Sequence, residues 1–207
     1  MKISTIFFDL GRVLVYFDWM LACNQIAEKA ELDAETVRER FLTDPLFAEY
    51  ELGHISTGSF CTHLKEKLLF EGTIEELEFA CCNIFSPLDE HIQMAYKLAE
   101  FYPMAIISNT CEAHIRFLEA RYDFFSIFRE KIYSFQVGCM KPDPHIYELA
   151  LQRMNANRYE SLFIDDLEEN VLTPSRMGWQ TIHLRPDVSL RLALQSYDLV
   201  GISALDI

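Results

Sequence analysis

The sequence predicts an α/β fold with a parallel sheet as its core, helices on both faces of that sheet, and a small helical cap inserted after the first strand. Three observations predict this fold. Short apolar runs end in polar clusters, helical patterns precede two of these runs, and a long segment after the first run has no clear strand pattern. Strands that alternate with helices are typical of parallel sheets covered on both faces.

Four apolar runs have the length and composition of buried strands: residues 6–8, 104–107, 162–164 and 181–184. Polar residues follow the first three runs directly: Asp9, then Ser108 and Asn109, then Asp165 and Asp166. Continuous apolar runs indicate strands that are buried on both faces. Ligands collect at the carboxyl ends of parallel strands, so we expect the three polar clusters to meet at one site.

Helical spacing precedes the second and third runs. One apolar face is formed by Ile92, Ala95, Leu98 and Ala99, and another by Ile146, Leu149, Ala150 and Met154. Apolar residues at three- and four-residue spacing predict amphipathic helices that pack on the sheet.

The segment 16–89 predicts a mostly helical insertion. Phe60, Leu64 and Leu68 recur at four-residue spacing behind a helix start at Ser56 or Thr57, and Thr73 with Glu76 fits a capping box. We therefore expect a core of residues 1–15 and 90–207 and a helical cap of residues 16–89.

Composition excludes several classes of function. The net charge of −14 repels nucleic acid, and no apolar run approaches the ~20 residues of a membrane span. None of the six cysteines forms a C-x-x-C pair, and the first nine residues are too short and too acidic for a signal peptide. We expect a cytoplasmic protein with reduced thiols, a monomer or homodimer, that contacts neither nucleic acid nor membrane.

Two of the polar clusters have both a structural and a chemical interpretation. Asp9 could cap a turn before Gly11, or it could be a nucleophilic carboxylate held at a strand end. Ser108 and Asn109 could be a helix N-cap, or their hydroxyl, amide and neighbouring backbone N–H groups could hold phosphoryl oxygens.

The remaining candidates carry charge. Lys141 is followed by Pro142 and Pro144, which suit a rigid loop that presents one ammonium group to a nucleophile and a transferring group. Asp165 and Asp166 are adjacent carboxylates at the end of a buried strand, where they repel each other and lose solvation. A hard cation with oxygen ligands would resolve that conflict, so the pair favours a metal site over a solvated acid pair.

Taken in order, these motifs resemble those of the haloacid dehalogenase-like hydrolases over essentially the whole chain. The matching segments are Asp9 to Val15, Ile107 to Asn109, Gly138 to Tyr147, and Phe163 to Asp166 with Asn170 following. The insertion resembles the small helical cap of this family, in which Gly53 to Ser56 with Phe60 is similar to a common segment. Within the family, the chain resembles bacterial sugar-phosphate phosphatases and the phosphatase domain of soluble epoxide hydrolase.

This resemblance implies a Rossmann-like core and an Mg²⁺-dependent phosphatase that acts on a small phosphorylated metabolite. Asp9 would attack phosphorus and become an aspartyl phosphate, with Lys141 bridging nucleophile and phosphate. Ser108 and Asn109 would hold the phosphoryl group. The Mg²⁺ ligands would be Asp9, Asp166 and the backbone carbonyl of Gly11, while Asp165 would bind through water or orient the site.

One position departs from the family pattern. Most phosphatases of the family carry, two residues after the nucleophile, an Asp that serves as general acid and base, whereas this chain has Gly11. General acid–base catalysis typically contributes ~10²–10⁴-fold, so the leaving group must be easy to expel or another group must supply the proton. Asp18 and His54 are candidates, whereas Arg12 does not give up its proton.

The departure keeps open a non-catalytic or weakly active phosphate-binding regulator. A haloacid dehalogenase is a separate alternative with less support. Dehalogenation attacks carbon and needs no metal, so it does not explain the acid pair. Aromatic residues of the cap could line the substrate site or simply form its core: Tyr16, Phe17, Trp19 and Phe47.

Overall fold

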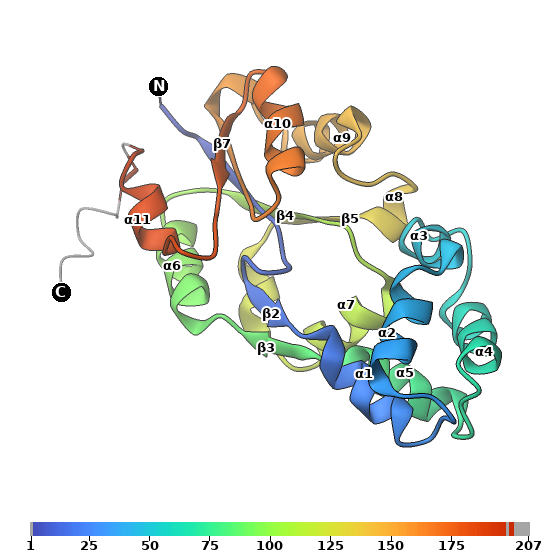
Figure 1. Ribbon diagram of the computed structural model, residues 1–207. Coiled ribbons are helices and arrows are strands. Elements are labelled where there is room, and N and C mark those ends of the chain that lie inside the picture. The colour runs from blue at the N-terminus through green and yellow to red at the C-terminus, as the bar shows by residue number, and fades with distance from the viewer. Residues whose placement is uncertain (1, 198, 201–207) are drawn as a thin grey trace.

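A computed structural model describes residues 2–197, 199 and 200, and it contains a central parallel sheet of five strands in the order β5-β4-β1-β6-β7 (Figure 1). These strands are β1 (Thr5–Phe8), β4 (Met104–Ser108), β5 (Glu130–Tyr133), β6 (Ser161–Asp165) and β7 (Gln180–His183). β1 lies in the centre, where Phe8 pairs with Ile106 on one side and with Ile164 on the other. The predicted α/β fold is therefore confirmed.

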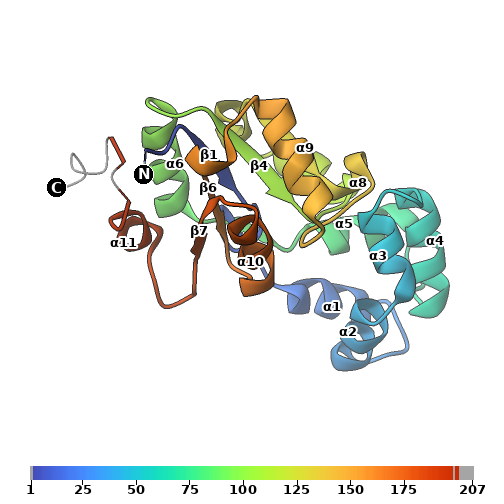
Figure 2. The same cartoon turned by 90° about the horizontal axis from the view of Figure 1, so that it is seen from above.

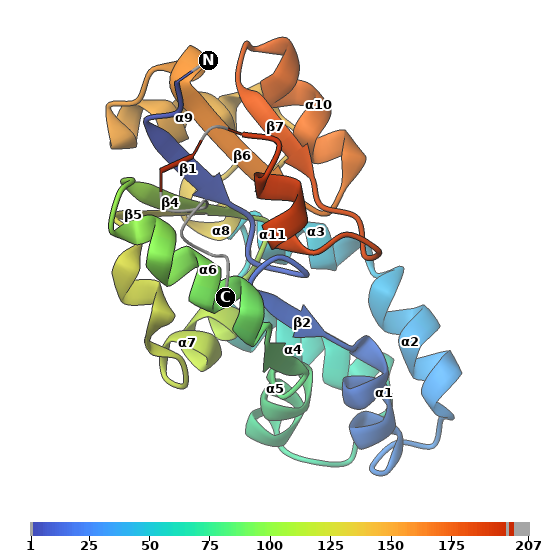
Figure 3. The same cartoon turned by 90° about the vertical axis from the view of Figure 1, so that its left-hand side faces the viewer.

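Both faces of the sheet are covered, because neighbouring side chains of β1 point into different apolar clusters. Ile6 and Phe8 pack with α6 (Asp89–Ala99), α7 (Glu112–Glu119) and α11 (Leu190–Leu194), whereas Phe7 packs with α9 (Pro144–Met154) and α10 (Glu168–Arg176). Figure 3 shows α9 and α10 on one side of the sheet and α6 on the other. Such two-sided burial is why β1, β4 and β6 read as unbroken apolar runs.

The insertion forms five helices to one side of the sheet (Figures 1 and 2): α1 (Trp19–Ala27), α2 (Ala34–Leu42), α3 (Pro45–Glu51), α4 (Thr57–Lys67) and α5 (Ile74–Cys82). A side chain caps the start of each helix. Ser56 accepts from the backbone N–H of Ser59, and Thr73 with Glu76 forms the predicted capping box. Phe60, Leu64 and Leu68 are buried in the cap's own apolar cluster, as their spacing predicts.

Three strands differ from the sequence expectation. β2 (Val15–Phe17) and β3 (Phe85–Pro87) form a short antiparallel pair at the two ends of the insertion, and β5 is a fifth strand of the main sheet. The cap cluster also includes Cys111 and Ala113, which follow β4. Residues 16–89 thus contain strand as well as helix, and the division into core and cap at residues 15 and 90 stays a prediction.

The remaining elements of the described residues are short: η1 (Asp123–Ile127), α8 (Ser134–Val137) and η2 (Arg158–Glu160). All six cysteines are buried free thiols, as expected for a chain without a disulfide framework. Within the described residues, no helix combines the length and apolar character that crossing a membrane requires.

Candidate active site

The sequence-predicted site residues meet at the carboxyl ends of three neighbouring strands. Asp9 follows β1, Ser108 ends β4 and Asp165 ends β6, while Lys141 lies in the turn before α9. The Lys141 ammonium donates to Asp9 Oδ1 and to Asp165 Oδ2, each at 2.6 Å. One lysine therefore joins two carboxylates that are far apart in sequence, as the strand order predicts.

Lys141 is almost fully buried, with 3% of its surface exposed. Burial alone would lower the pKa of Lys141, but the carboxylates of Asp165 and Asp9 raise it above its ordinary value. The ammonium is thus held in its charged form beside the Asp9 carboxyl. A buried charge of this kind is tolerated because it is paired and hydrogen-bonded.

Asp165 is held on every side. Its Oδ1 accepts from the Leu167 backbone N–H at 2.8 Å and from Asn170 Nδ2 at 3.0 Å, while Oδ2 accepts from Lys141. The side chain is fully buried, so it has no room to reorient. Asn170, which the sequence marks only as part of a motif, orients Asp165 and thereby Lys141.

The Asn109 side chain has a positioning task that sequence spacing does not reveal. Its Nδ2 donates to the Lys141 carbonyl and its Oδ1 accepts from the Lys141 backbone N–H, both at 2.8 Å. α7 begins at Glu112 with Cys111 as its N-cap, so the helix-capping interpretation of Ser108 and Asn109 is wrong. The Asn109 amide instead fixes the backbone that carries the buried ammonium.

Three carboxylates converge beside this lysine. Asp9, Asp165 and Asp166 each offer an oxygen, and these oxygens lie within 4.8 Å of one another. Burial raises the pKa of Asp9 to about 7 and also raises the pKa of Asp166, with the Asp165 charge adding to both shifts. Three carboxylates and one ammonium leave an excess of negative charge, which a divalent cation with a preference for oxygen ligands would neutralise.

A small pocket of about 80 Å³ lies beside this cluster, although none of the four charged side chains of the cluster lines it. Ser108, Asn109 and Gly11 line it from the core, while Phe17, Trp19 and Glu51 line it from the cap side. Phe47 packs instead among cap aromatics, and Tyr16 lies outside this pocket with 46% of its surface exposed. Two of the four aromatic candidates therefore line the site.

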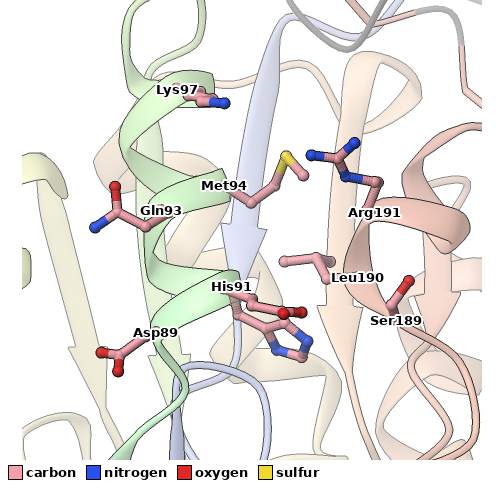
Figure 4. A pocket seen from close by; sticks show the side chains of 9 residues that line it. Asp89, His91, Gln93, Met94, Lys97, Ser189, Leu190 and Arg191 are labelled. Atoms are coloured by element: carbon pink, nitrogen blue, oxygen red, sulfur yellow. The ribbon is translucent and has the colours of Figure 1, made fainter. Parts of the chain in front are cut away.

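A larger hollow of about 440 Å³ lies away from the carboxylates, between α6 and α11. Figure 4 shows Met94 and Leu190 in this hollow, with Lys97 and Arg191 near one end and His91 near the other. Among the described residues, the carboxylate cluster at Asp9 is the single group of potential metal ligands. We therefore place the chemistry at the carboxylate cluster, beside the smaller pocket, despite the larger volume here.

Comparison with known proteins agrees with this geometry. The family model for haloacid dehalogenase-like hydrolases matches residues 3–178. The chain belongs to this family. Because the match spans most of the chain, the predicted resemblance is confirmed, and the protein is a haloacid dehalogenase-like hydrolase.

Individual relatives cover nearly the whole hydrolase. D-ribitol-5-phosphate phosphatase of Bacteroides thetaiotaomicron is 27% identical over 86% of this chain and 90% of its own. A haloacid dehalogenase family enzyme from the same organism, solved with magnesium and inorganic phosphate, superimposes with a TM-score of 0.83 at 21% identity, covering 91% of this chain and 98% of its own. A predicted family hydrolase from Porphyromonas gingivalis gives 0.80 at 25% identity, covering 95% and 98%.

Proposed function

We propose that this hydrolase is an Mg²⁺-dependent phosphatase that acts on a small phosphorylated metabolite through an aspartyl phosphate at Asp9. The observation that carries this proposal is the buried Lys141 ammonium, held at 2.6 Å from Asp9 and from Asp165 within a cluster of three carboxylates. Phosphoryl transfer needs this combination of a nucleophile, a fixed cation and a metal site.

The three carboxylates would have different roles at the Mg²⁺ site. Asp9, Asp166 and the Gly11 carbonyl would hold the ion. Asp165 would orient Lys141 and the bound ion. When bound, Mg²⁺ supplies positive charge that stabilises the phosphoryl oxygens. The surplus negative charge of the cluster and its oxygen-only donors fit this ion.

The chain's own residues carry out the transfer. An oxygen of Asp9 attacks phosphorus while the bond from phosphorus to the leaving alcohol breaks. The Lys141 ammonium, fixed by Asp165 and by the Asn109 amide, stays close to both the nucleophile and the transferring group. The Ser108 hydroxyl lines the pocket at the end of β4 and is placed to donate to a phosphoryl oxygen. Such fixed donors stabilise charge as it develops, without reorganisation.

The substrate pocket supports a small polyol or sugar phosphate. Its volume of about 80 Å³ suits a small molecule, and its lining combines the polar side chains of Ser108 and Asn109 with the aromatic rings of Phe17 and Trp19. The chain is similar over most of its length to a D-ribitol-5-phosphate phosphatase, which agrees with a substrate of this class.

Two other functions have less support. A haloacid dehalogenase would not need a third carboxylate beside the lysine, yet Asp166 lies within this cluster. A phosphate-binding regulator is favoured by a single feature, the absence of an acid side chain at Gly11. The ordered contacts around Lys141 favour catalysis over simple binding.

A direct test measures hydrolysis of 4-nitrophenyl phosphate, ribitol 5-phosphate and other sugar phosphates with Mg²⁺ and with EDTA. We expect metal-dependent release of phosphate and a preference for small polyol or sugar phosphates. Phosphate binding without turnover of any substrate would identify the regulator, and EDTA-resistant release of halide from a haloacid would identify the dehalogenase.

A further inference from the structure

A side chain at Gly11 would crowd the ring of Phe17. A Cβ at this position would lie 3.0 Å from Cε1 of Phe17, so the ring would have to shift to admit the carboxyl that is expected after the nucleophile. The two replacements suggested by sequence have other tasks: Asp18 accepts from the Met20 backbone N–H at 2.9 Å, and His54 pairs with Glu49 at 2.7 Å. The acid must therefore come from another element.

Glu51 is the carboxylate that is available to act as the missing general acid. It is the last residue of α3, and it lines the same small pocket as Gly11 and Ser108. Among the described residues that line this pocket, Glu51 has the only carboxyl group. Its carboxyl makes no hydrogen bond or ion pair with any other described side chain or backbone group, whereas Asp165 has four hydrogen bonds. An unpartnered carboxyl beside a reaction site is available to bind or protonate a substrate oxygen.

The surroundings of Glu51 favour its neutral, proton-bearing form. Burial raises the pKa of Glu51, while His114 on α7 and Lys141 in the turn before α9 lower it. His114 is itself buried, which lowers the pKa of this imidazole to about 4, so it is neutral near pH 7 and its opposing effect is lost there. The lysine ammonium is already shared between Asp9 and Asp165.

A close backbone contact fixes the end of α3 against the core. Gly53 has φ of +74°, and a Cβ at this position would lie 2.1 Å from the Phe135 carbonyl oxygen in α8. Only glycine accepts both the conformation and the approach. Four residues later, the Thr57 hydroxyl donates to Glu112 of α7 at 3.3 Å. Two contacts from the cap to the core therefore hold the segment that carries Glu51.

We propose that Glu51, supplied by the cap, is the general acid and base of this hydrolase, a role that rests on the proposed phosphatase function. As Asp9 attacks phosphorus and the phosphorus–oxygen bond of the substrate breaks, the Glu51 proton passes to the departing oxygen and gives a neutral alcohol. The resulting carboxylate then takes a proton from water as that water attacks phosphorus. The bond to Asp9 breaks, phosphate leaves, and Glu51 is again protonated.

The test compares Glu51→Gln with the wild type, and Glu49→Gln is the matched control. Glu49 lies on the same helix but is exposed and paired with His54. We measure kcat/KM for ribitol 5-phosphate, whose leaving group is a primary alcohol, and for aryl phosphates that differ only in ring substituents. Because kcat/KM reports events up to the first irreversible step, it isolates departure of the leaving group.

We expect Glu51→Gln to lower kcat/KM for ribitol 5-phosphate by ~10²-fold or more, but for 4-nitrophenyl phosphate by only a few-fold. The dependence on leaving-group pKa becomes steeper, and a burst of 4-nitrophenol appears because hydrolysis of the aspartyl phosphate is slowed. The wild-type fall of kcat/KM with rising pH, which reports loss of the Glu51 proton, is absent in the variant. Glu49→Gln behaves as the wild type in all these measurements.

Different results separate the two proposals. An equal loss for all leaving groups with an unchanged pH profile would show that Glu51 only binds or positions substrate, and would overturn its role as acid. A wild type that hydrolyses no phosphate ester with Mg²⁺ would overturn the phosphatase function itself. Activity with Mg²⁺ that vanishes in Asp9→Asn but is untouched in Glu51→Gln would keep the first proposal and reject the second.

Discussion

The core side and the cap side of the site differ in how their charged groups are held. On the core side, the Lys141 ammonium bridges Asp9 and Asp165, and Asn170 and Asn109 hold the two ends of this arrangement. On the cap side, apolar and aromatic residues surround one carboxyl, Glu51, which has no partner among the described residues. A hydrogen-bonded network such as that of Asp9, Lys141 and Asp165 suits a step that is the same for every substrate, whereas an unpartnered carboxyl such as Glu51 suits contact with the variable part of the substrate.

We infer from this contrast that core residues transfer the phosphoryl group, whereas cap residues contact the leaving group. Paired groups keep their geometry because moving one of them would leave a buried charge without a partner. A group held only by its helix can meet substrates of different shape. Changes on the core side should therefore affect every substrate, whereas changes on the cap side should affect substrates according to their leaving group.

The largest effect is expected on the core side, from Asp9→Asn. The amide keeps the shape of the side chain but is not a nucleophile, so turnover of every phosphate ester should fall by ~10⁴-fold or more. Steady-state assays on ribitol 5-phosphate and 4-nitrophenyl phosphate, with circular dichroism to confirm folding, measure this loss. Turnover within a few-fold of the wild type would show that Asp9 is not the nucleophile.

Lys141→Met should be the most destabilising change at the site. Removing one partner of a buried ion pair costs about 3–5 kcal/mol, because Asp9 and Asp165 then face each other without a cation. The pKa of Asp9 is already raised to about 7 by burial, so lowering the pH protonates it and removes part of the repulsion. Urea unfolding in EDTA should therefore show a larger loss at pH 8 than at pH 6. An equal loss at both values would mean that the charge is not the cause.

Sequence patterns predict the core side well because its residues follow buried strands. β1, β4 and β6 are continuous apolar runs, and the polar residues directly after them can meet in only one place. No apolar run indicates β5, because Glu130 and Lys131 interrupt the pattern at the half-exposed start of this edge strand. β2 and β3 have three residues each, too few for a period to show.

The cap side was harder to predict for a physical reason. Glu51 is one of many acidic residues in the chain and lies on a short helix. Its position depends on the contact between Gly53 and Phe135, which lies more than 80 residues later in the sequence. The clamp between Asn109 and Lys141 likewise joins residues that no local pattern connects. A glycine just after a short helix is a signal of close approach, but it does not identify the partner.

A smaller and more selective effect is expected from Gly53→Ala. The methyl group meets the Phe135 carbonyl and forces the end of α3 away from the core, which displaces Glu51. We expect kcat/KM for ribitol 5-phosphate to fall by about tenfold more than for 4-nitrophenyl phosphate, since only the former needs an acid. Gly58→Ala in α4 is the matched control, because its added Cβ meets nothing within 4 Å. Equal losses on both substrates would assign the contact to folding alone.

The smallest effect expected is the response of thermal stability to Mg²⁺. An ion that binds the native state alone stabilises it by RT ln(1 + c/Kd) at a free-ion concentration c, which is ~0.4 kcal/mol when c equals Kd. Asp166→Ala should remove this rise in Tm, whereas Glu169→Ala, at an exposed position nearby, should retain it. Because the pKa of Asp9 is raised to about 7, protons compete with the ion, and the rise should be smaller at pH 6 than at pH 8. An unchanged response in Asp166→Ala would place the metal elsewhere.

The most direct test of the account is to trap the phosphoenzyme. The wild type is mixed with Mg²⁺ and 4-nitrophenyl phosphate, quenched in acid within the first turnovers, and analysed by intact mass and peptide mapping. We predict a single added phosphoryl group on Asp9, which is absent in Asp9→Asn and more abundant in Glu51→Gln, since the latter hydrolyses the intermediate slowly. Turnover without any phosphoryl group on Asp9, or with the group on another residue, would contradict covalent catalysis by the core.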